Sequence, residues 1–208
     1  MPSLGFIHVF EPGLDPAAPP LLLLHGTGGD EHNLVALGRA LSPGSPLLSP
    51  RGKVSERGAA RFFARLAEGV FDPAEVARRT EELADFLAAA AAQYRFAQSR
   101  LIAVGISNGA NIAATLLQLR PAALGGAVLL RPMVVIDSPA PPHSLDGKRV
   151  LLLSGARDQF VPADHPHRLA AHLRAGDAEV DLQVLPDGHG LTRADVLATQ
   201  TWLKAPSR

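Results

Sequence analysis

The stretch that most constrains the fold runs from Leu101 to Asn111 and reads LIAVGISNGAN. Its first four residues are apolar and two are β-branched, which predicts a buried strand, and a helical pattern of small residues follows. A glycine on each side of Ser107 lets a strand and a helix approach closely at a sharp turn, with the serine hydroxyl exposed. The helix would also bring free N–H groups and its positive dipole end to the same place. Gly-x-Ser-x-Gly arises by chance in about one chain in ten of this length. The motif points to a nucleophile here because it lies between a predicted strand and a predicted helix.

Apolar runs and helical patterns alternate along the rest of the chain. The run Leu21–Leu24 contains no polar residue, which is typical of parallel strands that are covered on both faces. We expect strands at residues 6–10, 21–24, 47–49, 101–104, 126–130, 150–153 and 179–185. We expect helices at residues 31–41, 73–94, 110–120, 163–175 and 191–203. This alternation predicts one α/β domain over residues 1–208, with a mostly parallel, doubly wound sheet of about seven strands and no separate lid domain.

Capping residues predict where two of these helices begin. Asp30 is placed to cap the first helix. Asp72 can cap the longest one, with Pro73 at its first position and Glu75 completing a capping box. Residues 53–72 show no periodic pattern, so we expect an irregular segment that forms a flexible cover over any site.

The composition excludes several classes of function. Twenty basic and twenty acidic residues give a net charge of zero, which argues against nucleic acid or an anionic membrane surface as a partner. The absence of cysteine excludes disulfides and a Cys nucleophile. No apolar run reaches the roughly 18–20 residues of a membrane span, and the first residues lack the pattern of a signal peptide. We therefore expect a cytoplasmic protein.

Polar residues follow several predicted strands at the point where each strand ends. His25, Ser107, Asp158 and His189 all lie at such ends, where ligands bind in doubly wound sheets. A serine hydroxyl is a poor nucleophile until an imidazole takes its proton and a carboxylate holds that imidazole in the right tautomer. The chain order Ser107, Asp158, His189 is the order expected of α/β-hydrolases. We therefore predict these three as nucleophile, orienting acid and base.

Two backbone N–H groups are needed to hold the oxyanion that forms when the serine attacks a carbonyl carbon. Asn108, directly after the nucleophile, supplies one. The loop after the first buried strand supplies the other, which we assign to Thr27 within the small residues 26–29.

Alternative roles exist for some of these side chains. Asp158 competes with Asp164, which we place in the first turn of a helix, and with Asp187, which we place in a turn. His189 could instead satisfy a backbone group of its loop. His25 precedes Ser107 in the chain, so we expect it to shape the oxyanion loop rather than to act as a base.

A metal site is a further reading of the histidines His165, His167 and His172. Their spacing does not place them together on one helical face, and no carboxylate pattern joins them. We predict a solvated helix, no metal and no cofactor.

The chain also resembles a known family. The motifs that carry the resemblance lie at residues 21–31 (LLLLHGTGGDE), 105–111 (GISNGAN), 50–52 (PRG), 61–65 (RFFAR), 158–162 (DQFVP) and 188–190 (GHG). They resemble the phospholipase/carboxylesterase family of small α/β-hydrolases and, more narrowly, the bacterial hydrolases associated with methylhydroquinone and catechol resistance. The resemblance implies a lidless cytoplasmic serine esterase that is often a homodimer. The related dienelactone hydrolases use cysteine as nucleophile, so this chain departs from them.

Several residues near the predicted strand ends are candidates for binding substrate. Arg51 and Arg131 each follow a strand and could bind a carboxylate, or could form surface contacts or ion pairs, and the sequence leaves both readings open. Among the phenylalanines, Phe62, Phe63, Phe71 and Phe160 could line an acyl or aromatic pocket, and we expect at least half of them to pack in the core instead. The remaining candidates for substrate contact are His25, Gly28 and Met133.

These residues lead us to expect a serine carboxylesterase that hydrolyses a small soluble ester through an acyl-enzyme. A thioesterase acting on acyl thioesters or acylated proteins is the nearest alternative, because a missing lid permits a bulky substrate. A ligand receptor that keeps the fold without catalysis is an alternative of another class.

Overall fold

A central sheet of seven strands organises the described part of the chain, residues 4–205 of the computed structural model. The strands are β1 (His8–Glu11), β2 (Leu21–Leu24), β3 (Leu47–Pro50), β6 (Ile102–Ile106), β7 (Gly126–Leu130), β8 (Arg149–Gly155) and β9 (Glu179–Leu185). Their order across the sheet is β1-β3-β2-β6-β7-β8-β9. β1 runs antiparallel to β3 and every other pair is parallel. The predicted mostly parallel sheet of about seven strands is therefore confirmed.

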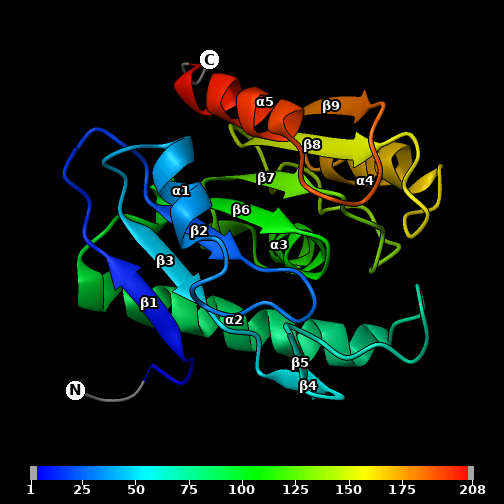
Figure 1. Cartoon of the computed structure of the whole chain (residues 1–208), viewed down its shortest axis with the longest axis horizontal. Coiled ribbons are helices and arrows are strands. Elements are labelled where there is room, and N and C mark those ends of the chain that lie inside the picture. Colours follow the sequence, from blue (N-terminus) through cyan, green and yellow to red (C-terminus); the bar gives the residue numbers. More distant parts are fainter. Residues whose placement is uncertain (1–3, 206–208) are drawn as a thin grey trace.

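Helices cover both faces of this sheet (Figure 1). They are α1 (Val35–Leu41), α2 (Pro73–Tyr94), α3 (Asn108–Leu119), α4 (His165–Arg174) and α5 (Arg193–Lys204), with short 3₁₀ turns η1 (Gln98–Arg100) and η2 (Pro121–Ala123). α1 and α5 lie on one face, while α2, α3 and α4 lie on the other. Because helices lie on both faces, the sheet is doubly wound, as predicted.

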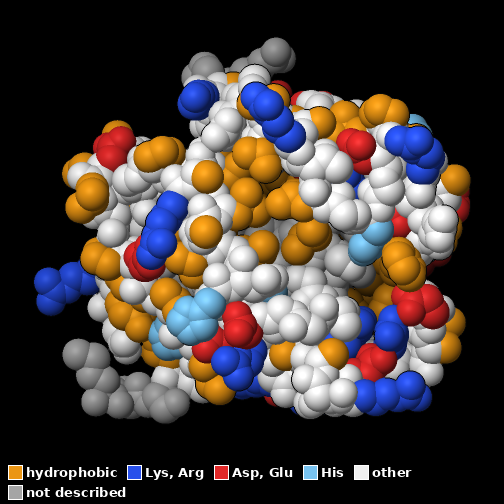
Figure 2. Space-filling view, in the orientation of Figure 1, with side chains coloured by type: hydrophobic (Ala, Val, Ile, Leu, Met, Phe, Trp, Pro, Cys, Tyr) orange, Lys and Arg blue, Asp and Glu red, His pale blue; other side chains and the backbone are white. Residues whose placement is uncertain are grey.

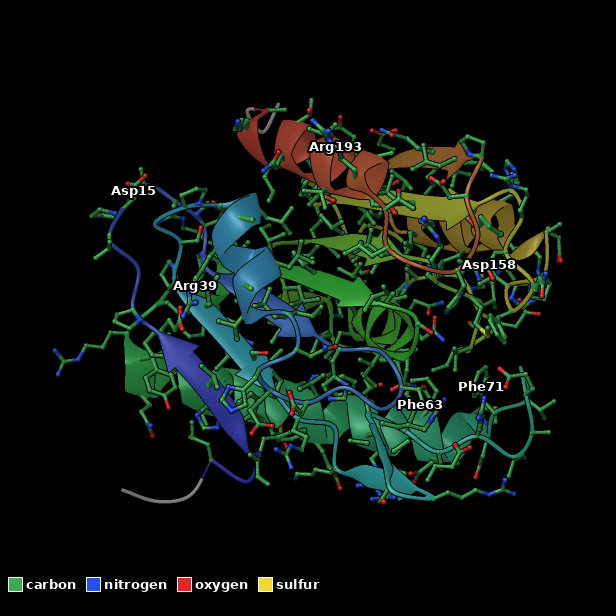
Figure 3. All side chains as sticks on the ribbon, viewed as in Figure 1. Asp15, Arg39, Phe63, Phe71, Asp158 and Arg193 are labelled. Carbon is green, nitrogen blue, oxygen red and sulfur yellow. The ribbon has the colours of Figure 1, made fainter. Side chains whose placement is uncertain are left out.

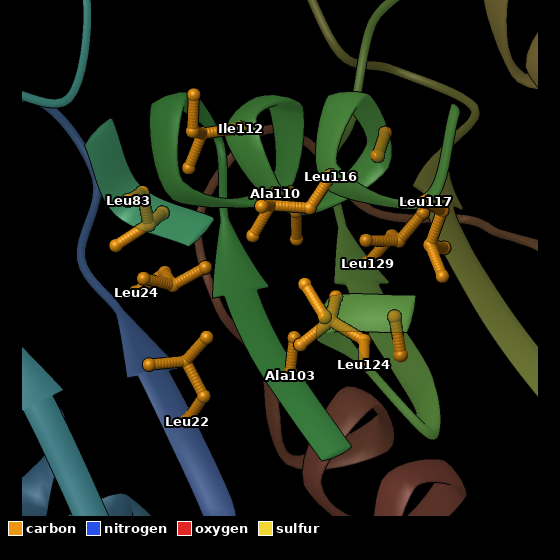
Figure 4. Close-up of a cluster of buried hydrophobic side chains, with 14 of the residues drawn as sticks. Leu22, Leu24, Leu83, Ala103, Ala110, Ile112, Leu116, Leu117, Leu124 and Leu129 are labelled. Atoms are coloured by element: carbon orange, nitrogen blue, oxygen red, sulfur yellow. The ribbon is translucent and has the colours of Figure 1, made fainter. Parts of the chain in front are cut away.

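The two faces explain why the strand sequences are continuously apolar. Leu22 and Leu24 point toward the face covered by α2 and α3, in the same buried cluster as Leu83 and Leu116, with Leu24 beside Leu83 (Figure 4). Leu21 and Leu23 point the opposite way, into the core beneath α1 and α5. Successive strand residues alternate between faces, so a strand covered on both sides must be apolar at every position.

The long helix α2 begins as the sequence predicts, with one difference in its cap. The Asp72 carboxylate accepts a 2.9 Å hydrogen bond from Ala74 N, and Pro73 occupies the first position. Glu75 does not complete a capping box, because its carboxylate binds Arg78 and Arg79 of the same helix. One face of α2 is buried along its whole length: Val76, Thr80, Leu83, Phe86, Leu87 and Ala90.

Three local expectations are wrong. The first strand begins at His8 rather than at residue 6. α1 begins at Val35, because the Asp30 carboxylate accepts a hydrogen bond from His32 N and so stabilises a turn instead of capping the helix. Residues 53–72 are not irregular throughout: β4 (Val54–Glu56) and β5 (Ala59–Arg61) form an antiparallel hairpin. Its two turn residues both have positive φ, 52° at position 57 and 87° at the glycine of position 58, which suits a two-residue hairpin turn.

The face of the molecule drawn in Figure 2 shows no dominant charge. In Figure 2, acidic and basic side chains are interspersed, and hydrophobic side chains gather between α1 and α5 on the face turned to the viewer. Within residues 4–205, no helix has the length and apolar character needed to cross a membrane.

Candidate active site

Ser107 lies at a sharp turn between β6 and α3. Its backbone has φ 52° and ψ −117°, a conformation that L-residues rarely adopt. The flanking glycines are required by close packing: a Cβ at Gly109 would lie 2.0 Å from Leu24 O, and one at Gly105 would lie 2.5 Å from Gly109 O. The two glycines therefore let α3 pack directly against β2 and β6, and the strained turn points the serine side chain out of the sheet.

The structure brings the three predicted side chains into one hydrogen-bonded chain. His189 Nε2 lies 2.9 Å from Ser107 Oγ, and His189 Nδ1 lies 2.8 Å from Asp158 Oδ2. Asp158 is held in place, because its second oxygen accepts hydrogen bonds from Phe160 N and Val161 N. The Asp158 side chain is only 1% exposed, whereas that of His189 is 26% exposed. The imidazole thus connects a buried carboxylate with a serine hydroxyl in the geometry that proton transfer needs.

The two competing carboxylates lie elsewhere. Asp164 is at the N-cap of α4 and forms an ion pair with Arg168. Asp187 accepts a hydrogen bond from Thr192 Oγ1. Asp158 is the carboxylate whose oxygen is hydrogen-bonded to His189 within the described residues.

Thr27 and Asn108 both line the cavity beside Ser107. Neither backbone N–H donates a hydrogen bond to another described residue, so both are available to an oxygen in the cavity. The Asn108 side chain has a separate role, because its Oδ1 accepts a 2.7 Å hydrogen bond from Phe62 N. This bond ties the segment after β5 to the start of α3.

The cavity has a volume of about 480 Å³, within the roughly 300–1,000 Å³ typical of small-molecule sites. Its lining residues are Gly26, Thr27, Asn33, Arg61, Arg65, Glu68, Phe71, Ile106, Ser107, Asn108, Asn111, Met133, Phe160, His189 and Gly190. Of the residues predicted to contact substrate or to line its pocket, Phe71, Met133 and Phe160 are among them. Phe160 is 54% exposed, and its ring packs edge-on against His189 with centroids 5.0 Å apart.

Three other candidates for substrate contact instead make contacts within the protein. His25 is buried, with Nδ1 on Gly26 O and Nε2 accepting from Gly52 N. Burial lowers the pKa of His25, which keeps Nε2 free to accept. The predicted shaping role of His25 fits these contacts, and substrate binding does not. Gly28 N donates to a carbonyl of the β4–β5 hairpin, and Phe63 is fully buried against Phe71 (Figure 3).

The two candidate arginines are not among the cavity-lining residues, and each is paired with a carboxylate. Arg51 forms a two-point ion pair with Glu31, at 2.5 and 2.8 Å. Arg131 is 1% exposed and makes two 2.8 Å hydrogen bonds to the carboxylate of Asp195. Of the two readings that the sequence leaves open, the ion pair is correct for both.

Sequence reasoning missed three charged cavity residues at the end of β5 and in the segment that follows it, namely Arg61, Arg65 and Glu68. Phe71 of the same segment also lines the cavity, and the sequence did name it as a possible pocket residue. The signal was present in residues 61–65, which carry part of the family resemblance. The lack of a periodic pattern in this segment predicted an irregular cover and gave no polar role to its side chains.

The histidines of α4 and its start take part in local contacts. His165 Nδ1 accepts a hydrogen bond from Val134 N, and His172 lies 3.4 Å from Asp137. Among residues 4–205, no group of three His, Cys, Asp or Glu side chains is arranged to hold a metal ion.

The doubly wound sheet, with a serine at the sharp turn between its central strand and α3, defines the class of α/β-hydrolases. A Bacillus subtilis (strain 168) protein named "Putative hydrolase MhqD" is 42% identical over 197 residues, covering 95% of this chain and 97% of the relative. The chain belongs to the phospholipase/carboxylesterase family of α/β-hydrolases. No protein-family model matches the chain.

Solved structures support the same fold and family. The crystal structure of the Bacillus cereus carboxylesterase is 41% identical and superposes with a TM-score of 0.92, covering 96% of this chain and 93% of that one. A carboxylesterase from Mesorhizobium loti is 30% identical, with a TM-score of 0.89 and coverage of 99% and 98%. Similarity to carboxylesterases thus extends over nearly the whole chain.

Proposed function

We propose that this protein is a serine carboxylesterase that hydrolyses a small soluble ester through an acyl-enzyme. The observation that carries the proposal is the hydrogen-bonded chain from Asp158 through His189 to Ser107. Ser107 and His189 of this chain line a cavity of small-molecule size. Similarity to proteins named carboxylesterase supports the choice of an ester as substrate.

In the first half of the reaction, Ser107 Oγ attacks the ester carbonyl carbon while His189 Nε2 takes the serine proton. The carbonyl oxygen becomes an oxyanion, which the N–H groups of Thr27 and Asn108 stabilise. Asp158 holds His189 in the tautomer that accepts at Nε2 and stabilises the imidazolium. His189 then donates the proton to the leaving alcohol oxygen as the C–O bond breaks, which leaves an acyl group on Ser107.

In the second half, a water molecule takes the place of the alcohol. His189 removes a proton from this water as its oxygen bonds to the acyl carbon, and the same two N–H groups hold the second oxyanion. Collapse of this intermediate releases the carboxylic acid and returns the proton to Ser107 Oγ. One water is consumed, and the enzyme is restored.

Replacement of Ser107 by alanine tests the proposal. With a short-chain p-nitrophenyl ester, kcat/KM of Ser107→Ala should fall by at least about a thousandfold, because no nucleophile remains. Ser138→Ala is the matched control, since Ser138 is exposed and lies outside the cavity lining. Circular dichroism should show both variants folded. Hydrolysis by Ser107→Ala at the wild-type rate would refute the assignment.

A further inference from the structure

Three charged side chains line the cavity beside Ser107: Arg61, Arg65 and Glu68. Arg65 is fully paired, because it forms ion pairs with both Glu56 and Glu68. Its charge is therefore balanced by two carboxylates of its own segment. Arg61 differs.

Arg61 is buried, with 5% of its side chain exposed. Its hydrogen bonds go to neutral acceptors: Nε donates to Phe63 O at 3.1 Å and Nη1 donates to Thr27 Oγ1 at 2.5 Å. The nearest carboxylate oxygen, Glu56 Oε2, is 3.4 Å from Nε, and this oxygen accepts no hydrogen bond from the described residues. Arg61 thus has an ion-pair partner nearby but no hydrogen bond to a carboxylate.

One nitrogen of Arg61 remains available. Nη2 donates no hydrogen bond to any residue between 4 and 205, and it is not among the buried side-chain atoms that lack a partner. Nη2 therefore keeps some accessible surface, and the cavity that Arg61 lines is the route by which a ligand would reach it.

Comparison with Arg131 shows what is missing. Arg131 is buried to a similar degree, and two 2.8 Å hydrogen bonds to Asp195 compensate its charge. A buried charge is costly unless a partner hydrogen-bonds to it. Burial, and next the neighbouring charge of Arg65, lower the pKa of Arg61. A carboxylate from a ligand would supply the contact that the protein leaves unmade.

We propose that Arg61 Nη2 binds a carboxylate of the substrate, so that the enzyme acts on esters carrying a free carboxylate in addition to the ester group. This inference rests on the proposed esterase function. Arg61 is hydrogen-bonded to the side chain of Thr27, whose N–H is the proposed oxyanion donor, so the carboxylate would lie a short distance from the reacting carbonyl. Monoesters of short dicarboxylic acids and acyl esters of short hydroxy acids both fit this description.

The first experiment uses the wild-type protein and matched esters at pH 7.5. Ethyl hydrogen succinate is compared with ethyl butyrate for a carboxylate on the acyl side, and 3-acetoxypropanoate with propyl acetate for the alcohol side. In at least one pair, kcat/KM for the charged ester should exceed that of its neutral match by about 10- to 150-fold, the range for a hydrogen bond between charged groups. A ratio below tenfold in both pairs overturns the inference.

The second experiment measures the same ratio in variants. Arg61→Met should reduce the ratio to about one. Glu56→Gln should raise it, because the carboxylate that competes for the guanidinium is removed. Arg39→Met is the control and should leave the ratio unchanged, since Arg39 lies on α1, at the opposite side of the molecule from Asp158, and pairs with Glu11 (Figure 3). Preference for the charged ester that survives in Arg61→Met overturns the inference.

The ratio also separates substrate binding by Arg61 from a purely structural role and from misfolding. If Arg61 served only to hold Thr27, Arg61→Met would slow charged and neutral esters equally and leave the ratio intact, which refutes the inference. If Arg61→Met does not fold, the wild-type ratio and Glu56→Gln still decide the question. Hydrolysis of neutral esters without any preference would refute this inference alone, whereas a Ser107→Ala variant as active as wild type would refute the proposed function.

Discussion

Arg131 is buried between the end of β7 and the loop that carries His189. Beyond its two bonds to Asp195, its guanidinium donates to Gly188 O at 2.8 Å and to Gly190 O at 3.3 Å. These carbonyls lie on either side of His189, so one side chain holds both neighbours of the proposed base. Replacement of Arg131 by methionine keeps most of the side-chain volume and removes every one of these bonds. We predict that Arg131→Met loses stability and also loosens His189.

The magnitude follows from the burial of Asp195, whose side chain is 0% exposed. In Arg131→Met its carboxylate keeps the hydrogen bonds from Thr192 N and Oγ1, at 2.8 and 2.9 Å, but loses its cation. Removing one partner of a buried ion pair costs about 3–5 kcal/mol. The loop carbonyls lie nearer the surface, where water can replace the lost donor, so they add little. With a urea m-value of about 2–3 kcal/mol/M, the unfolding midpoint should fall by roughly 1–2.5 M.

Urea unfolding followed by circular dichroism measures the first effect, and the rate at which a fluorophosphonate labels Ser107 measures the second. Arg149→Met is the matched control: Arg149 also donates to carbonyls of α5 and the residue after it, Trp202 O and Ala205 O, but at the far end of that helix. It should cost about 1 kcal/mol and leave labelling unchanged.

The double variant Arg131→Met/Asp195→Asn separates the two effects. The neutral amide of the Asp195→Asn substitution would carry no unpaired charge, so part of the stability should return. Labelling of Ser107 should stay slow, because the loop carbonyls still lack their donor. An Arg131→Met protein within about 1 kcal/mol of wild type would refute the energetic argument. Labelling at the wild-type rate would refute the positioning argument.

Three further predictions address the turn, the orienting acid and pH. Gly109→Ala should destabilise the fold by at least about 3 kcal/mol in urea unfolding, since the new Cβ would lie 2.0 Å from Leu24 O; wild-type stability would contradict the packing argument. Asp158→Asn should lower kcat about 10⁴-fold on a p-nitrophenyl ester, whereas kcat of Asp164→Asn should stay within twofold of wild type; the reverse pattern would assign the role of orienting acid to Asp164. Burial lowers the pKa of His25 in the folded state, so below about pH 6.5 the unfolded chain binds a proton that the folded chain does not. The free energy of unfolding should therefore fall as pH drops from 6.5 toward 5, and His25→Gln should show a shallower fall; equal slopes would exclude His25 as a source.

Much of the fold could be predicted because its signals are local. The strand at Leu21–Leu24 and the helix after Asp72 each show their pattern within a few residues. The hairpin of residues 54–61 is the exception, since its strands have three residues each and too little length for a periodic pattern. Its turn at Arg57 and Gly58 was the available signal.

The residues of the candidate site also differ in whether a local sequence signal reveals their role. Ser107, Asp158 and His189 could be assigned because each follows a strand, and parallel strands end at one edge of the sheet. The roles of Arg51 and Arg131 could not, since an arginine after a strand looks the same whether it faces a ligand or a carboxylate. Their partners are 20 and 64 residues away in the chain.

By itself, the sequence determined the fold class, the turn at Ser107 and the order of the residues that meet there. These depend on hydrophobic periodicity, glycine placement and strand ends, which are properties of short segments. Only the tertiary structure decided which buried arginine is hydrogen-bonded to a carboxylate and which cavity-lining arginine is not. Arg131 was paired with Asp195 from another element, and Arg61 was left without a carboxylate hydrogen bond. Burial and electrostatic pairing arise between segments far apart in the chain, so they appear only once the chain is folded.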